Sequence, residues 1–96
     1  MIKEILHNPK VKPFFDSNLE SYNEIEIINK NGNISRLDRI VEMKDKSINI
    51  IDYKTGTEKD EDILQVENYK NILKEIEDKN ITAYLIYIDL NKVVKV

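Results

Sequence analysis

The sequence predicts a small α/β domain in which a mixed β-sheet is flanked by helices. Three observations lead to this class. Residues 22–53 alternate apolar and polar side chains, which is the period of β-strands, whereas residues 60–78 repeat apolar side chains at helical spacing. Residues 81–88 form an almost unbroken apolar run, as expected of a strand covered on both faces. The predicted order of elements is αβββαβ.

Length and composition limit the possible classes of protein. The chain has 96 residues, enough for one domain with one modest core, so a two-domain enzyme with a cleft between lobes is excluded. Hydrophobic residues at 41% and charged residues at 34% are typical of a soluble globular protein. The net charge of −3 argues against a module that binds nucleic acid through a strong positive field, but not against an enzyme that holds DNA through a metal.

Composition also bears on location. The chain has no cysteine, which excludes a disulfide framework and a thiolate metal site and fits a reducing compartment. No apolar stretch approaches the ~20 residues that span a bilayer, and the first residues lack a signal-peptide pattern. We therefore expect a cytoplasmic protein without a membrane partner.

The first predicted element is a short helix over residues 8–15. Asn8 is a suitable N-cap, and Pro9 fits the first helical position, where the missing N–H would have no partner in any case. A short apolar face would be formed by Val11, Phe14 and Phe15.

Three antiparallel strands are expected next. Residues 22–28 alternate, and the turn cluster at 29–33, built around an Asn-Gly pair, indicates a hairpin to a second strand at 34–43. A short polar stretch at 44–46 then separates this strand from a third at 47–53.

A helix and one or two strands complete the predicted fold. After Gly56 the period becomes helical over residues 60–78, and the acidic first turn suits the positive end of the helix dipole. The strand at 81–88 should lie parallel to the third strand, because a helix connects them. Residues 91–96 could form a last short strand. One face of the helix carries Asp62, Gln65, Val66, Tyr69, Ile72, Leu73 and Ile76.

Polar residues that interrupt the strands are the candidates for chemistry. In the third strand, Asp52 and Lys54 continue the face of Ile48 and Ile50, because residues two apart in a strand point the same way. Asp38 interrupts the second strand in the same manner. An even register, with Asp38 opposite Asp52 or opposite Lys54, would bring all three onto one face, whereas an odd register would separate them.

If Asp38 and Asp52 lie side by side, they predict a metal site. Adjacent carboxylates raise each other's proton affinity unless a cation lies between them, and Mg²⁺ prefers a few carboxylates plus water and phosphate oxygens. Lys54 could orient a metal-activated water or offset charge in the transition state, which is the chemistry of phosphodiester hydrolysis. The alternative is an ordinary ion pair of Asp52 and Lys54 at a strand end, with Asp38 in a loop.

Gln65 and Tyr69 favour the first interpretation. Their four-residue spacing puts them on the same face of the helix, and that face is otherwise largely apolar. Because an amide is costly to bury without partners, this face should meet a polar site near the strand ends. The ring of Tyr69 can serve both packing and function.

These residues resemble the PD-(D/E)XK nuclease superfamily, and within it the RecB-type nuclease domain at the end of helicase–nucleases of the AddAB and RecBCD kind. Three motifs carry the resemblance, in order, within residues 32–69. They are similar to the family's aspartate after a glycine-bearing hairpin, its DYKT/S motif and its QxxxY helix. The matching words are Ser35-Arg36-Leu37-Asp38-Arg39-Ile40, Ile50-Ile51-Asp52-Tyr53-Lys54-Thr55-Gly56 and Gln65-Val66-Glu67-Asn68-Tyr69.

The resemblance implies a restriction-endonuclease-like αβββαβ core and a set of site roles. Asp38 and Asp52 would hold Mg²⁺ or Mn²⁺, and the backbone carbonyl of Tyr53 would be a further metal ligand. Lys54 would assist the attacking water. The implied activity is metal-dependent hydrolysis of DNA, of the exonuclease type, in DNA repair and recombination.

Two further residues and two partners follow from the resemblance. Gln65 and Tyr69 would support the site or touch the DNA backbone. The implied partners are DNA and a helicase domain or subunit.

One departure from the family pattern concerns its metal-binding histidine, which lies in a Gly-Thr-x-x-His segment well upstream of the first aspartate. No such segment is present, and His7, the only histidine, is interpreted as a surface or helix-edge residue. Residues 1–96 are therefore expected to form a single nuclease-like domain that lacks the upstream helix, as a fragment or a degenerate stand-alone copy. Glu24 stands where many relatives have a glutamate, but we expect Glu24 and Glu26 to be solvated.

Three functional hypotheses follow. The first is a metal-dependent DNA nuclease core. The second is a nuclease-like module that binds DNA or a helicase partner without cutting, motivated by the missing histidine segment and the net charge of −3. The third is a small α/β domain whose charged residues are all solvated.

Overall fold

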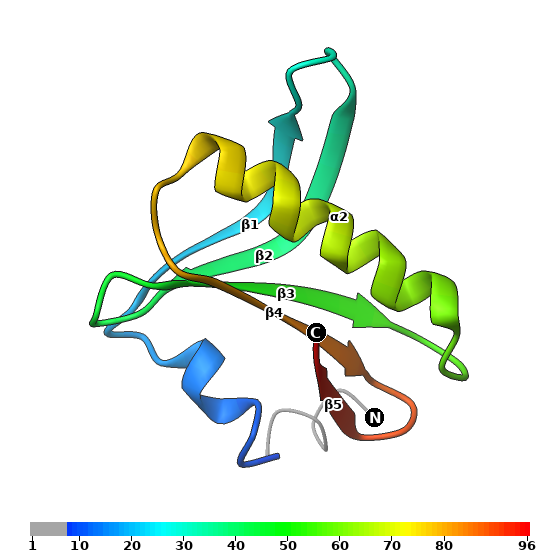
Figure 1. Ribbon diagram of the computed structural model, residues 1–96. Helices are drawn as coiled ribbons and strands as arrows, with labels where there is room; N and C mark the ends of the chain where they lie inside the picture. The colour runs from blue at the N-terminus through cyan, green and yellow to red at the C-terminus, as the bar shows by residue number, and fades with distance from the viewer. Residues whose placement is uncertain (1–7) are drawn as a thin grey trace.

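The computed structural model describes residues 8–96, in which five strands form a mixed sheet against one long helix (Figure 1). The spatial order is β1-β2-β3-β4-β5, and all neighbours are antiparallel except β3 and β4, which are parallel. The predicted α/β class is confirmed, including the last short strand. The elements are η1 (Lys12–Phe15), β1 (Glu20–Ile28), β2 (Ile34–Glu42), β3 (Ile48–Lys54), α2 (Asp60–Ile76), β4 (Ile81–Tyr87) and β5 (Lys92–Lys95).

Helix α2 covers one face of the sheet, as Figure 1 shows. Its buried stripe packs on strand residues such as Ile50 and Leu85, which have no exposed surface. The helix buries a narrower face than the sequence predicts. Ile76, expected on that face, is 54% exposed because it is the last residue of the helix. The buried helix residues are Val66, Tyr69, Ile72 and Leu73.

A second apolar cluster lies on the opposite face of the sheet, where Phe14 of η1 packs with Val41, Ile51 and Ile86. Short helical structure therefore flanks this face, but the predicted helix over residues 8–15 is wrong in type and extent. The observed helix is a 3₁₀ helix of four residues. Pro13 explains the difference, because proline has no N–H for a helix begun at Pro9 and disfavours helical backbone in the residue before it.

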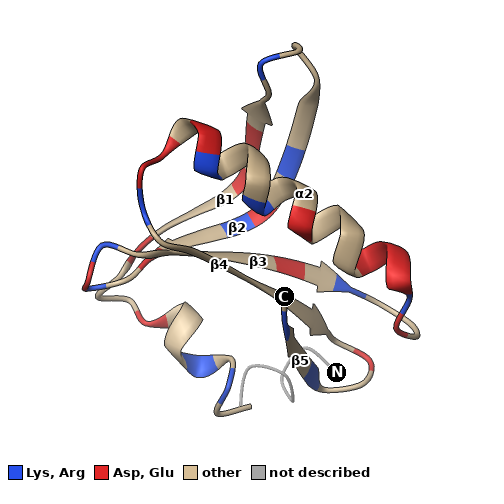
Figure 2. Ribbon diagram, viewed as in Figure 1, with Lys and Arg blue, Asp and Glu red and all other residues tan. Residues whose placement is uncertain are grey.

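The charged side chains are distributed unevenly (Figure 2). The first turn of α2 is acidic, with Asp60, Glu61 and Asp62, which suits the positive end of the helix dipole. Strand β3 ends with an acidic residue, Asp52, and a basic one, Lys54. Within residues 8–96 there is no helix of the length and apolar character that crossing a membrane requires.

Candidate functional site

The predicted site centres on the place where β2 separates from β3. The β2–β3 ladder pairs Ile40 with Ile50 and Arg39 with Ile51. Carried one residue further, this register sets Asp38 opposite Asp52, which is one of the two even registers considered from the sequence. Instead of a continued backbone ladder, the Tyr53 N–H donates to Oδ2 of Asp38 at 2.9 Å.

Strand β1 is distorted at the same level. Glu24, the residue that the β1–β2 register sets opposite Asp38, has a φ of +52°, which is uncommon for a residue other than glycine. Leu37 and Ile40, three residues apart, both belong to the cluster under α2, so strict alternation is interrupted between them. This irregularity lies directly at Asp38 and turns its carboxylate toward β3.

Asp52 is the buried acid of the site, with a residue exposure of 5%. Its pKa is raised from 3.8 to about 6, mainly by burial and in addition by the neighbouring carboxylate of Asp38, while Lys54 acts to lower it. Asp38 and Asp52 are therefore neighbours, as the sequence predicts, and repulsion between their negative charges contributes to the raised pKa of Asp52.

Lys54 connects the strand to the helix. Its Nζ lies 3.2 Å from Oδ2 of Asp52 and donates a hydrogen bond of 2.7 Å to Oε1 of Gln65. Partial burial by itself lowers the pKa of Lys54, but the charge and hydrogen bond of Asp52, together with the charges of Asp62 and Tyr69, outweigh it, so the pKa is raised and the ammonium stays protonated. Lys54 therefore bridges an acid on β3 and an amide on α2.

Gln65 and Tyr69 both face this group from α2. Burial raises the pKa of Tyr69, and the charge of Asp52 adds to the increase. The prediction that Gln65 lies inside the apolar stripe is wrong, since its residue is exposed and lies at the edge of the stripe. The side chain still meets the polar site, because its oxygen accepts from Lys54.

The donor set fits a hard divalent cation held in part by water. Oδ2 of Asp52 is buried, and among residues 8–96 it has no hydrogen-bond partner, only the ion pair with Lys54. Those residues contain no cluster of three His, Cys, Asp or Glu side chains at metal-binding distance. Mg²⁺ is commonly bound by one or two carboxylates, with waters and phosphate oxygens as the other ligands, which Asp38 and Asp52 match. The carbonyl of Tyr53 as a further ligand stays a prediction.

Two side chains that the sequence reasoning did not assign anchor α2 at the site. Tyr87 lies opposite Lys54 in the β3–β4 pair, and its hydroxyl donates to Oδ2 of Asp62 at 3.1 Å. Burial raises the pKa of Tyr87 to about 12. The same Asp62 oxygen accepts from the Lys59 N–H at 3.2 Å, so one carboxylate both caps the helix and ties it to β4 one turn before Gln65.

The loop after Lys54 is held by the turn between β4 and β5. The Ile88 N–H donates to the Lys54 carbonyl at 3.0 Å, and the Gly56 N–H donates to Oδ2 of Asp89 at 2.8 Å. Gly56 has a φ of +77°, which glycine adopts at little cost. The loop that follows the candidate lysine is thus fixed by contacts that no local sequence pattern indicates.

Asp89→Ala is expected to lower the free energy of unfolding by about 1 kcal/mol, because the Gly56 N–H loses its acceptor. Asp89→Asn should retain most of that stability, since its amide oxygen can still accept. Urea unfolding of both variants tests this, with amide exchange at Gly56 as the local readout. Equal unfolding curves for the wild type and Asp89→Ala would contradict it.

Other residues considered from the sequence do not join the site. His7 lies outside the described residues. Glu24 forms an exposed ion pair with Arg36 at 3.3 Å, in agreement with its expected solvation, and Glu26 is exposed. Neither glutamate contacts the Asp52–Lys54 pair.

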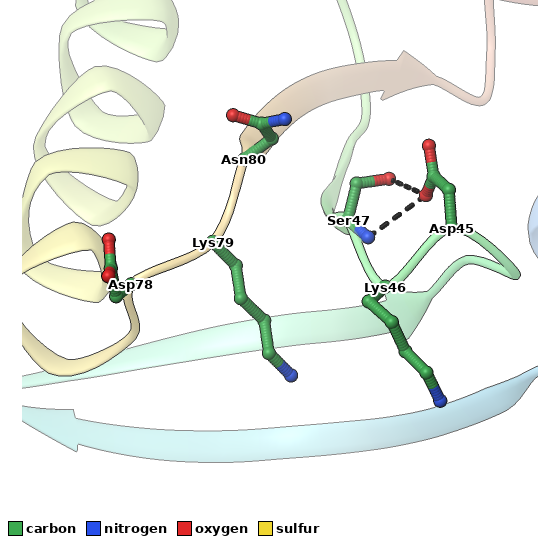
Figure 3. Close-up of a pocket in the computed structure, with 6 residues that line it drawn as sticks. All are labelled: Asp45, Lys46, Ser47, Asp78, Lys79 and Asn80. Carbon is green, nitrogen blue, oxygen red and sulfur yellow. Dashed lines mark hydrogen bonds between the residues drawn. The ribbon is translucent and has the colours of Figure 1, made fainter.

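A polar pocket lies far from these groups, at the end where β3 and β4 begin (Figure 3). The ammonium groups of Lys46 and Lys79 lie 3.8 and 3.9 Å from the carboxylate of Glu42. The Ile48 N–H donates to the Asn80 carbonyl, which joins the two loops that form the pocket. These contacts hold the two loops together and have a structural role. Its lining residues are Asp45, Lys46, Ser47, Asp78, Lys79 and Asn80.

Comparison of the chain with models of protein families and with curated proteins found no match.

Proposed function

We propose that this protein is a metal-dependent DNA nuclease core of the RecB type, within the PD-(D/E)XK superfamily, that hydrolyses phosphodiesters in DNA repair and recombination in the cytoplasm. The observation that carries the proposal is the buried Oδ2 of Asp52, which lies beside a second carboxylate and forms an ion pair with Lys54 at 3.2 Å, but has no hydrogen-bond partner among residues 8–96. A buried carboxylate with a raised pKa and a specific charged neighbour is typical of functional sites.

Each side chain has a role that its contacts support. Asp38 and Asp52 would bind Mg²⁺ or Mn²⁺, which would polarise the phosphodiester and lower the pKa of an attacking water. Lys54 would orient that water and offset the negative charge on the phosphoryl oxygens in the transition state. Gln65 holds the Lys54 ammonium, and Tyr69 closes the apolar side of the site.

The test is cleavage of end-labelled linear DNA by the purified chain with Mg²⁺ or Mn²⁺, beside the same reaction in EDTA. We expect metal-dependent release of nucleotides by the wild type and none by Asp52→Ala. Asp78→Ala, which removes an exposed carboxylate elsewhere, is the matched control and should cleave like the wild type. Equal cleavage by the wild type and Asp52→Ala, or none by either, would refute the nuclease proposal for this chain.

A non-cutting module that binds DNA or a helicase partner is the second candidate. It is favoured by the absence, among residues 8–96, of a third acidic or histidine side chain beside Asp38 and Asp52. Calorimetric titration with Mn²⁺ distinguishes the two candidates. Binding that Asp52→Ala abolishes supports the nuclease, whereas no binding together with retained affinity for DNA or a helicase supports the module.

A further inference from the structure

A pocket of about 440 Å³ lies on the face of the sheet that η1 covers, opposite α2. Its volume is within the range of small-ligand sites, about 300–1,000 Å³. Phe14 of η1, Asn49 of β3 and Tyr84 of β4 line it, and we call it the η1 pocket. It shares no residue with the candidate metal site, so an inference drawn from it goes beyond the proposed function.

Asn49 brings an unpartnered amide to the η1 pocket. The residue is only 8% exposed, and no group within residues 8–96 forms a hydrogen bond with its side chain. In the same range, Oδ2 of Asp52 is the one side-chain atom that is fully buried without a hydrogen-bond partner. The amide atoms of Asn49 therefore keep some accessible surface, which faces the pocket that this residue lines. Because an amide is costly to bury without partners, Oδ1 and Nδ2 are available to accept from and donate to a ligand.

Two aromatic rings form one wall of the η1 pocket. The ring centres of Phe14 and Tyr84 lie 4.8 Å apart, with the ring planes inclined at 45°. Phe14 is buried, whereas Tyr84 is half-buried, and Met43 and Val93 add apolar surface to the lining. Aromatic and apolar walls of this kind suit a flat conjugated ring such as a nucleobase.

Two lysines give the η1 pocket a positive charge. Lys10 and Lys95 both line it, and neither forms an ion pair with any group in residues 8–96. Within that range no acidic side chain lines the pocket. Lys95 lies opposite Tyr84 in the β4–β5 pair, so the charge adjoins the aromatic wall. Because a lysine ammonium binds phosphate as a point charge, the expected ligand carries a phosphate beside its ring.

We propose that the η1 pocket is a binding site for an adenine nucleotide. Adenine is favoured because an asparagine amide matches its edge with two hydrogen bonds, Oδ1 accepting from the N6 amino group and Nδ2 donating to N7. The base would lie against Tyr84, and the phosphate would lie near Lys10 and Lys95. A flat aromatic carboxylate has the same ring and charge but lacks the paired donor and acceptor of adenine.

The test is an NMR titration of the ¹⁵N-labelled protein with adenosine 5′-monophosphate (AMP), inosine 5′-monophosphate (IMP) and adenosine. EDTA is present throughout, so that no metal can hold a phosphate at Asp38 and Asp52. We expect AMP to shift the amide signals of Asn49 and Tyr84. IMP should bind roughly tenfold more weakly, because its carbonyl replaces the amino group that donates to Oδ1. Adenosine should also bind roughly tenfold more weakly, because it has no charge for the lysines.

Two variants separate the contributions of the amide and the charge. Asn49→Leu is expected to weaken AMP binding roughly tenfold and to remove the difference between AMP and IMP, while the fold persists because the amide has no partner to lose. The double variant Lys10→Gln/Lys95→Gln should weaken AMP binding to the level of adenosine and leave adenosine binding unchanged. Lys30→Gln, in the β1–β2 turn, removes the same kind of charge elsewhere and should bind AMP like the wild type.

Each outcome decides the proposal. Absence of shifts at Asn49 and Tyr84, or AMP binding that Asn49→Leu does not weaken, overturns the site. Equal affinities for AMP and IMP overturn the assignment to adenine, and indole-3-acetate bound as tightly as AMP would assign the pocket to aromatic carboxylates instead. If Asn49→Leu fails to fold, the lysine variant and the comparison of AMP with IMP still decide. Because the titration measures binding in EDTA, its result is independent of whether the protein cleaves DNA.

Discussion

Lys54→Ala is expected to lower the turnover number for DNA cleavage by roughly 10²–10⁴-fold while the affinity for Mn²⁺ stays nearly unchanged. The two effects should separate because, in the proposed mechanism, the lysine does not bind the metal. Its ammonium lies 3.2 Å from Oδ2 of Asp52 and 2.7 Å from Oε1 of Gln65, so it supplies a fixed positive charge beside the two carboxylates. In the proposed mechanism, removing that charge would remove assistance to the attacking water and leave both carboxylates in place.

The metal titration for Lys54→Ala is best made near pH 8. Loss of a cation beside Asp52 raises the pKa of this acid further above its present value of about 6, so a lower pH would mix proton competition with metal binding. Lys74→Ala, on the exposed last turn of α2, removes the same charge without touching the site and should cleave DNA at the wild-type rate. Loss of Mn²⁺ affinity together with turnover in Lys54→Ala would mean that the lysine acts through the metal site instead.

The sequence predicts the strands and helix α2 well because each depends on a local period, whereas the short helix predicted over residues 8–15 rested on an N-cap signal and is wrong in type and extent. Alternation along β1, β2 and β3 and the helical spacing in α2 can each be recognised within one segment. The register in which neighbouring strands pair cannot be recognised in this way. The β2–β3 turn has Lys46 at a φ of +73°, a conformation that a glycine or asparagine would have indicated and a lysine does not. The choice between even registers therefore stayed open until the structure showed Ile40 opposite Ile50.

The detailed geometry of the candidate site depends on irregular backbone and on contacts between distant segments. The distortion that aims Asp38 at β3 occurs at Glu24 and Leu37, and neither residue is of a type that indicates a bulge. Asp89 holds the loop after Lys54 across 33 residues of chain. An aspartate in a turn is ordinary, so only the fold reveals its partner. Residue types and spacing could therefore identify the acids and the lysine, but not the contacts that hold them.

Asp52→Asn is expected to raise the free energy of unfolding of the metal-free protein at pH 7 by up to about 3 kcal/mol, which is what a pKa change from 3.8 to about 6 represents. The folded state raises the pKa of Asp52, so the unfolded state loses its proton first as pH rises. The stability that this group contributes is fully present below about pH 4 and is lost as pH rises to about 6. Asparagine has nearly the same shape and does not ionise, so it avoids that loss.

Urea unfolding in EDTA at several values between pH 4 and pH 7 measures the effect as a difference between the two proteins. The difference should be small near pH 4 and grow until about pH 6, and Asp78→Asn should follow the wild type throughout. If the free energies of unfolding of Asp52→Asn and the wild type differed by the same amount at every pH, the raised pKa of Asp52 would be contradicted. Addition of Mn²⁺ at about 100 times its dissociation constant should stabilise the wild type by about 2.7 kcal/mol and leave Asp52→Asn unchanged. The charge of Asp52 is costly to bury alone and would be stabilised by a cation, so the raised pKa of this carboxylate supports the proposed metal site.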